Sequence, residues 1–249
     1  MASAAATARS RTAGYSELTL AGDYRLSSPT HRATATISLP GDVHTALLKS
    51  KQIPDPYFGA NEQAVMWVSH TPWTMERTFS ATAADIDGYL TLTLDSVDTF
   101  ATVLLNGKVV GRTGNMFVRY DFDVTGKVKA GDNTLRLEFG VSRDIAWERS
   151  SAHPFPLPFT SNYKSNGLPG IPMNFIRKVA CHAGWDWGIC LMPIGVYGRM
   201  AIRRSRLARQ ESVQVAQRHF RDRVELTLTT RVFAFAEGEV HLTHQLDGE

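Results

Sequence analysis

Strict alternation of apolar and polar residues is the feature that most limits how this chain can fold. Leu90, Leu92 and Leu94 are separated by threonines, and the same two-residue period returns at residues 118–124 and 135–139. Side chains that alternate in this way point to opposite faces of a strand, one for a core and one for solvent. We therefore predict antiparallel strands here, and we expect others at residues 15–20, 33–39, 73–79 and 196–203.

The clearest turn motif is the pair Asn106 and Gly107. It joins the apolar stretches 101–105 and 108–110, and Asn-Gly best tolerates the positive φ angles of a two-residue type I′ turn. Helix-like spacing occurs in one short segment, 42–53, where an aspartate can cap the first turn. Because each half-apolar sheet must bury its face on another sheet, we predict an all-β sandwich of the jelly-roll type.

Changes in pattern divide the chain into three parts. Residues 1–14 are rich in Ala, Ser and Thr without the apolar run of a signal peptide, which is typical of a disordered tail. The jelly roll is expected over residues 15–205. At residues 206–249 the alternation indicates three or four strands, which we interpret as the start of an immunoglobulin-like sandwich. We expect the chain to stop within that domain, because such a sandwich needs about 100 residues.

Composition narrows the function classes. The net charge of +3 is too small to indicate nucleic acid or a membrane surface as a partner, and no aromatic residues interleave with the arginines at 199–209, which fit the solvent face of a strand. No stretch approaches the ~18 apolar residues of a membrane span, and without a signal peptide a cytoplasmic location is favoured. A zinc site at Cys181, His182 and Cys190 would lack a fourth ligand, so we expect no metal and no cofactor.

The alternation stops between residues 141 and 176, where prolines punctuate a run of Ser, Asn and Gly. An insertion of this length without regular structure is either disordered or functional. Its aromatic residues, Phe155, Phe159 and Tyr163, favour packing, and it leads directly to the segment at 185–187. The alternative is a long surface loop that covers an edge strand.

The segment at 185–187 sets one carboxylate between two indoles. A sugar ring offers an apolar C–H face that packs on an aromatic plane, and hydroxyls that a carboxylate grips through charge-assisted hydrogen bonds. Trp185 and Trp187 would supply the planes and Asp186 the carboxylate. Alternatively the two indoles, two positions apart on a strand, share one face and belong to the core, with Asp186 in solvent. The three residues alone leave both interpretations open.

Five segments carry a resemblance to a known family: residues 40–48, 53–62, 97–107, 115–124 and 177–188. Over these segments the chain resembles the N-terminal part of the β-mannosidases of glycoside hydrolase family 2. The Asn-Gly hairpin is shared with the β-galactosidase and β-glucuronidase branches. The helix around His44, the sequence Ile-Pro-Asp-Pro at 53–56 and Trp-Asp-Trp-Gly at 185–188 point to the mannosidase branch.

The resemblance implies a jelly-roll domain that is followed by immunoglobulin-like domains and a (β/α)₈ barrel with two catalytic glutamates. In that family the Trp-Asp-Trp segment leans over the barrel mouth and contacts the terminal mannose. Carried onto this chain, Trp185, Asp186 and Trp187 become the substrate-binding residues. Asp186 would hold O2 and O3 of mannose, whose axial O2 distinguishes it from glucose.

Other polar residues near these segments are candidates for supporting roles. Arg177 and Lys178 either neutralise the carboxylate of the Trp-Asp-Trp segment, tether its loop or simply face solvent. His182 is a further candidate supporting residue. Glu62 and His44 are interpreted as structural.

Catalytic residues are not expected in this chain. Retaining glycoside hydrolysis needs two carboxyl groups about 5–5.5 Å apart. The sequence offers no such pair, since Asp95 and Asp98 lie at a strand end, where aspartates are usually solvated or capping. We therefore predict the sugar-binding portion of a retaining exo-β-mannosidase, inactive alone, whose partners are a β-mannoside oligosaccharide and the missing catalytic barrel.

Three other interpretations stay open at this point. The chain can be a free-standing carbohydrate-binding module that uses the same aromatic site. It can belong to another family 2 glycosidase, of the endo-β-mannosidase, β-galactosidase or β-glucuronidase type. It can also be an interaction domain whose tryptophans belong only to the core, in which case a fluorescence quencher would not reach them.

Overall fold

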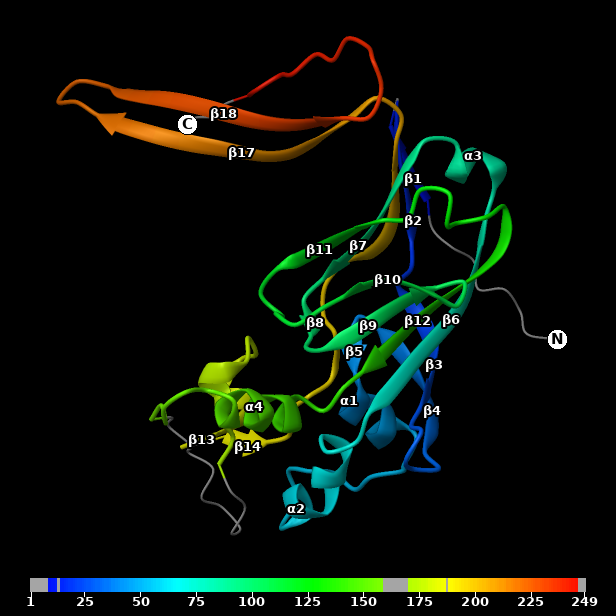
Figure 1. Ribbon diagram of the computed structural model, residues 1–249, viewed down its shortest axis with the longest axis vertical. Helices are drawn as coiled ribbons and strands as arrows, with labels where there is room; N and C mark the ends of the chain where they lie inside the picture. Colours follow the sequence, from blue (N-terminus) through cyan, green and yellow to red (C-terminus); the bar gives the residue numbers. More distant parts are fainter. Residues whose placement is uncertain (1–8, 13, 159–169, 187, 246–249) are drawn as a thin grey trace.

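The computed structural model describes residues 9–12, 14–158, 170–186 and 188–245, and in it two antiparallel sheets lie face to face (Figure 1). The five-stranded sheet has the order β1-β2-β16-β7-β11, with the strands β1 (Arg9–Thr12), β2 (Tyr15–Thr19), β16 (Met200–Ser205), β7 (Tyr89–Asp95) and β11 (Arg119–Asp123). The six-stranded sheet has the order β10-β9-β12-β6-β3-β4, with β10 (Lys108–Arg112), β9 (Ala101–Leu105), β12 (Gly131–Phe139), β6 (Trp73–Ala81), β3 (Gly22–Ser27) and β4 (Thr34–Leu39). The predicted all-β sandwich is confirmed.

The core lies between the two sheets and follows the predicted alternation. Leu90, Leu92 and Leu94 of β7 are at most 1% exposed, and they belong to one cluster with Leu135 and Leu137 of β12. Burying a side chain of this size stabilises the folded state by about 1.5–3 kcal/mol. The sandwich therefore rests on the apolar positions that the sequence pattern identified.

The predicted hairpin and helix are both present. Asn106 and Gly107 have φ angles of 52° and 78°, as a type I′ turn between β9 and β10 requires. The helix α1 (Val43–Lys49) is shorter than the predicted 42–53, and Asp42 caps it by accepting a hydrogen bond from the Thr45 amide at 3.0 Å.

Three further helices and several strands were not expected from the sequence. The helices are α2 (Asn61–Val65), α3 (Ala83–Ile86) and α4 (Ser142–Ser151), with short 3₁₀ turns at Met66–Val68, Met173–Phe175 and Ala180–His182, and the strands include β3 of the six-stranded sheet. Helix α4 occupies the start of the stretch predicted to lack regular structure. The helix has few apolar residues that would indicate a helical period. Ala146 is its one residue in a small buried hydrophobic cluster with Ile171 and Ile176. No helix in the described ranges is long and apolar enough to cross a membrane.

Two small sheets at one end of the sandwich bring distant segments together. One joins β5 (Gly41–Asp42), β15 (Gly195–Val196) and β8 (Val97–Asp98), and the other is the hairpin of β13 (Ala183–Trp185) and β14 (Gly188–Cys190). At Gly195 a Cβ atom would lie 2.1 Å from the Gly41 carbonyl oxygen, so a residue without a side chain is needed there. The same junction reaches the start of α1, where the Val43 amide donates to the Ile194 carbonyl oxygen at 2.9 Å.

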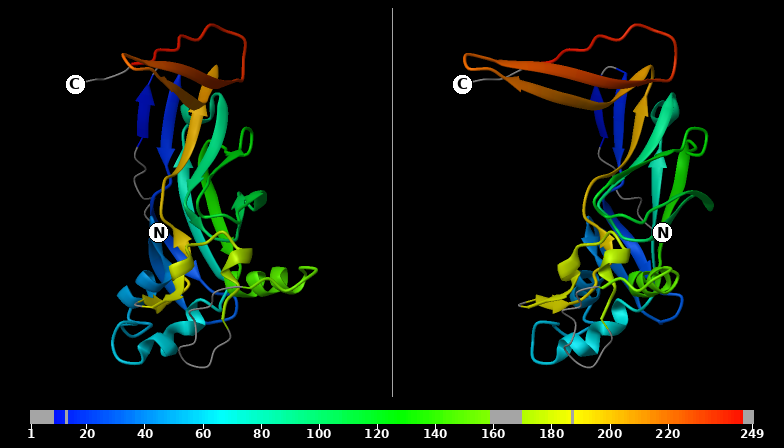
Figure 2. Two further views of the ribbon diagram at one scale, coloured as in Figure 1. Left: turned by 90° about the vertical axis from the view of Figure 1, so that its left-hand side faces the viewer. Right: turned by 60° about the vertical axis from the view of Figure 1, so that its left-hand side comes forward.

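The two ends of the chain differ from expectation. The long hairpin of β17 (Ala208–His219) and β18 (Val224–Ala234) projects from the sandwich, far from β13 and β14 (Figure 2). Residues 240–245 form no strand, so the described part of 206–249 holds two strands and not three or four. Within the predicted tail at 1–14, β1 forms a strand because the exposed edge of β2 offers it backbone partners. The immunoglobulin-like assignment of 206–249 stays a prediction.

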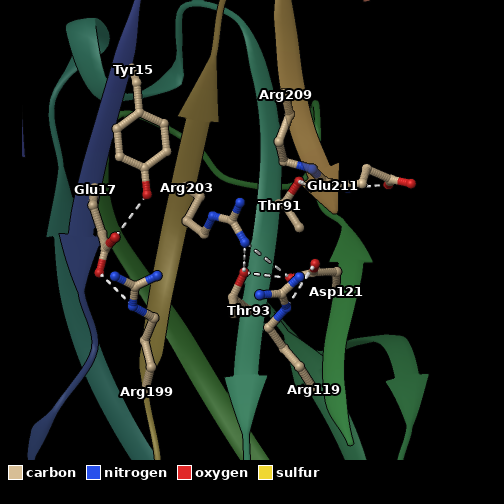
Figure 3. Close-up of polar contacts among 10 residues, drawn as sticks. All are labelled: Tyr15, Glu17, Thr91, Thr93, Arg119, Asp121, Arg199, Arg203, Arg209 and Glu211. Atoms are coloured by element: carbon tan, nitrogen blue, oxygen red, sulfur yellow. Dashed lines mark hydrogen bonds and ion pairs between the residues drawn. The ribbon is translucent and has the colours of Figure 1, made fainter. Parts of the chain in front are cut away.

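A polar network covers the outer face of the five-stranded sheet (Figure 3). The Arg203 guanidinium lies 3.3 Å from the Thr93 hydroxyl and 3.5 Å from the Asp121 carboxylate, and Arg199 pairs with Glu17 at 3.3 Å. From the sequence, these arginines were expected on a solvent face. The side chain of Arg203 is in fact only 10% exposed, because β16 lies between β2 and β7, whose side chains flank it.

Candidate functional site

A pocket of about 930 Å³ is lined by the β13–β14 hairpin and by the residues around the start of α2. These elements lie at the end of the sandwich opposite the β17–β18 hairpin (Figure 1). Two segments far apart in sequence line the pocket. The lining residues are Pro56, Tyr57, Gly59 and Glu62 from the first segment, and Cys181, His182, Gly184, Trp185, Asp186, Gly188, Ile189, Leu191 and Pro193 from the second. The structure therefore brings three of the six predicted site residues, Trp185, Asp186 and His182, into one concave surface.

The hairpin of β13 and β14 carries two of these residues at its turn. Trp185 is 39% exposed and Asp186 is exposed, and both line the pocket. The alternative that places Trp185 in the core is wrong, because the residue is exposed and is absent from both clusters of buried residues. Trp187, the second predicted aromatic plane, lies outside the described residues. An indole face and an exposed carboxylate at one pocket are the groups that a sugar ring needs.

A buried ion pair fastens the base of this hairpin to the sandwich. The Lys178 ammonium donates to the Asp98 carboxylate at 2.5 Å and to the Pro193 carbonyl oxygen at 2.6 Å. The Met192 amide donates to the His182 carbonyl oxygen at 2.9 Å. Lys178 thus joins the segment that enters the hairpin, the segment that leaves it and the strand β8.

Asp98 is a residue that the sequence analysis misjudged. It was expected to be solvated or capping, but its side chain is fully buried against Lys178 and lies 3.3 Å from Nδ1 of His182. Burial alone would raise the pKa of Asp98, but the contacts with His182 and Lys178 outweigh it and hold the pKa below its usual value. The carboxylate therefore stays ionised and holds Lys178 in place.

The three candidate supporting residues occupy different positions. Lys178 does not face solvent, and its ammonium contacts Asp98 instead of neutralising Asp186. His182 lines the pocket next to Asp98. Arg177 is exposed, and its carbonyl oxygen accepts a hydrogen bond from the Met116 amide at 3.0 Å.

Glu62 fastens the hairpin from its other side. Its Oε1 atom accepts a hydrogen bond from the Cys190 amide at 2.9 Å, which joins α2 to β14. Because the acceptor is a carboxylate, this bond contributes about 1.5–3 kcal/mol, more than a neutral one. The interpretation of Glu62 as structural agrees with this contact, although the residue also lines the pocket.

His44 lies in the core beneath the site. It is buried on α1, and neither of its ring nitrogens has a hydrogen-bond partner among the described residues. Burial, assisted by the charge of Lys178 and opposed by that of Asp42, lowers the pKa of His44 to about 4. The imidazole is therefore neutral at physiological pH.

Metal binding finds no support in the described part of the chain. No cluster of three or more His, Cys, Asp or Glu side chains there has the arrangement of a metal site. Cys181 and Cys190 are not joined in a disulfide; the first is exposed and the second buried.

Comparison with known proteins identifies the fold. Residues 24–198 match the family model of the glycosyl hydrolase 2 galactose-binding domain-like proteins. The chain belongs to glycoside hydrolase family 2. Its sandwich corresponds to the N-terminal domain of the β-mannosidase-like members of this family, as the sequence resemblance implied.

Several relatives within family 2 are named β-mannosidases. The chain is 34% identical to β-mannosidase B of Aspergillus terreus over 161 residues, which are 64% of this chain and 18% of the relative. It is 32% identical to a probable β-mannosidase of Caenorhabditis elegans over 197 residues, 77% of this chain and 22% of the relative. The chain thus spans about a fifth of the length of these curated relatives.

Solved structures share the fold of this chain. The crystal structure of the β-D-mannosidase of Dictyoglomus thermophilum superposes on 88% of this chain with a TM-score of 0.79 and 27% identity, and this covers 26% of that protein. An exo-chitosanase of Amycolatopsis orientalis shares the fold at 18% identity, with a TM-score of 0.62 over 88% of this chain and 24% of that one.

Proposed function

We propose that this chain is the sugar-binding portion of a retaining exo-β-mannosidase, which removes terminal non-reducing β-D-mannose from oligosaccharides. The observation that carries the proposal is the hairpin turn at the pocket, where Trp185 and Asp186 lie side by side in the sequence and both line the concave surface. The names of the family 2 relatives support the substrate class.

The two side chains suit the two faces of a sugar. The Trp185 indole offers an apolar plane to the C–H face of the ring, and Asp186 offers two oxygens to a pair of neighbouring hydroxyls. In mannose O2 is axial, so a carboxylate placed for O2 and O3 loses a hydrogen bond when glucose is bound. A polar group left unpaired in a binding site discriminates strongly between substrates. Asp186 is therefore proposed as the group that selects mannose.

The anchoring of the hairpin supports this role. Lys178 and Asp98 fix its base, and Glu62 fixes the strand β14 from the other side. A binding group that is already held in place loses little conformational entropy when the ligand arrives, so more of the contact energy appears as affinity.

Hydrolysis itself is assigned to a catalytic barrel in the complete polypeptide. Two carboxyl groups about 5–5.5 Å apart are needed, one as nucleophile and one as acid and base. The proposed partners are thus a β-mannoside oligosaccharide and that barrel, and the chain of residues 1–249 is proposed to be inactive alone.

An assay of both proteins tests this proposal. The polypeptide encoded by the complete gene is expected to hydrolyse an aryl β-mannoside with retention of anomeric configuration, followed by NMR, while the purified chain 1–249 gives no hydrolysis above the buffer control. Hydrolysis by the chain 1–249 alone would contradict the proposal that this chain is non-catalytic. If the complete polypeptide prefers a β-galactoside or a β-glucuronide, or if the gene ends at Glu249, the β-mannosidase assignment fails.

A further inference from the structure

The first segment of the pocket, residues 56–62, contributes an exposed aromatic residue to the lining. Tyr57 lines the pocket and is 76% exposed. Its neighbour Phe58 is 77% exposed but is not part of the lining. The chain thus carries two adjacent aromatic residues of nearly equal exposure, of which only Tyr57 belongs to the pocket lining.

A network of local hydrogen bonds holds the turn that carries Tyr57. Asp55 accepts from the Tyr57 amide with its side chain at 2.9 Å and from the Phe58 amide with its carbonyl oxygen at 3.2 Å. The Asn61 side chain donates to the same carbonyl oxygen at 2.8 Å. Gly59 has a φ of 58°, a conformation that glycine adopts without strain. The exposed ring is therefore held on a fixed turn.

This turn is connected to the hairpin of Trp185 and Asp186. Glu62 follows the turn by a few residues, and its carboxylate accepts the hydrogen bond from the Cys190 amide. The two segments that line the pocket are thus bonded to each other. A ligand that touches Asp186 lies in the same concave space as the ring of Tyr57.

We propose that Tyr57 is a second aromatic contact for the substrate, where its ring packs on the C–H face of a sugar unit in the pocket and helps set ligand preference. This inference rests on the function proposed above. A tyrosine suits this role, since it supplies a large rigid surface and only two side-chain torsion angles lose freedom when it binds. Its hydroxyl can also form a hydrogen bond with a sugar hydroxyl.

The test is an NMR titration of the full chain 1–249 with β-1,4-mannobiose up to about 50 mM, a range set by the millimolar affinity expected of so few contacts. Tyr57→Ala is compared with Phe58→Ala, its matched control, and with Asp186→Ala. We expect Tyr57→Ala to weaken binding about 5- to 10-fold and Tyr57→Phe to weaken it about 2-fold, because the ring carries most of the contact. Phe58→Ala is expected to leave Kd unchanged.

The outcomes separate this inference from the proposed function. If Asp186→Ala abolishes binding while Tyr57→Ala and Phe58→Ala both bind as the parent chain does, the role of Tyr57 is refuted and the proposed function stands. If the parent chain shows no saturable binding, or if Asp186→Ala has no effect, the proposed function itself fails and the inference fails with it. Thermal unfolding of each variant checks that a change in Kd is not a loss of fold.

Discussion

The ammonium of Lys178 lies 2.5 Å from the carboxylate of Asp98, and neither side chain is exposed to solvent. The pair joins two residues 80 positions apart and sits at the base of the hairpin that carries Asp186. Its position links the stability of the sandwich to the shape of the pocket.

Removal of Lys178 is predicted to destabilise the protein strongly. Lys178→Met leaves the Asp98 carboxylate buried without its partner, which costs about 3–5 kcal/mol. Urea denaturation measures this loss. The double variant Asp98→Leu with Lys178→Met is expected to recover part of it, since no buried charge remains. A double variant as unstable as Lys178→Met would contradict the account.

An exposed ion pair provides the control for that measurement. Arg206 and Asp87 lie 3.0 Å apart, but their side chains are 58% and 69% exposed. Asp87→Ala is expected to change the free energy of unfolding by less than about 1 kcal/mol, because solvent screens such a pair.

Loss of the Glu62 carboxylate is predicted to loosen the hairpin locally. Glu62→Ala removes the acceptor of the Cys190 amide, and exchange of that amide proton with deuterium is expected to become about 10- to 100-fold faster, as a hydrogen bond worth about 1.5–3 kcal/mol implies. Glu62→Gln keeps an acceptor oxygen and is expected to change exchange less. Equal protection in Glu62→Ala and the parent chain would show that this bond does not hold β14.

Stability is predicted to fall on mild acidification through His44. Its pKa is lowered to about 4 in the folded state by burial, against 6.5 in the unfolded chain, so the unfolded chain binds the proton first. Stability is therefore complete above pH 6.5 and is lost as the pH falls toward 4, by up to about 3 kcal/mol. In His44→Leu this part of the pH dependence, measured by urea denaturation between pH 7 and 4.5, is expected to disappear. An unchanged slope would assign the acid sensitivity to other groups.

Local pattern predicted much of the fold. The alternation at Leu90–Leu94 gave a strand, the positive φ angles tolerated by Asn106 and Gly107 gave a hairpin, and the Asp42 carboxylate gave a helix cap, because each depends on neighbours in sequence. Helix α4 was missed because its packing depends on Ala146 and on a cluster formed by residues far along the chain.

The site was predictable only in part, for the same reason. Trp185 and Asp186 stand out because an indole beside a carboxylate has an evident chemistry. Asp98 does not, since an aspartate at a strand end is usually solvated, and its burial depends on Lys178, 80 residues later. Tyr57 likewise enters the pocket only through the folded junction between residues 56–62 and the hairpin.

The central claim is that Asp186 selects mannose, and the most direct test is substrate discrimination in the complete polypeptide. We predict that Asp186→Ala lowers kcat/KM for an aryl β-mannoside about 100- to 10,000-fold, the value of two charge-assisted hydrogen bonds. For the matching β-glucoside, which makes only the bond to O3, we predict a loss of about 10- to 100-fold. Asp132→Ala, an exposed aspartate outside the pocket, is the control and should change neither. If Asp186→Ala keeps the parent enzyme's ratio of mannoside to glucoside activity, as Asp132→Ala is expected to do, Asp186 does not select mannose.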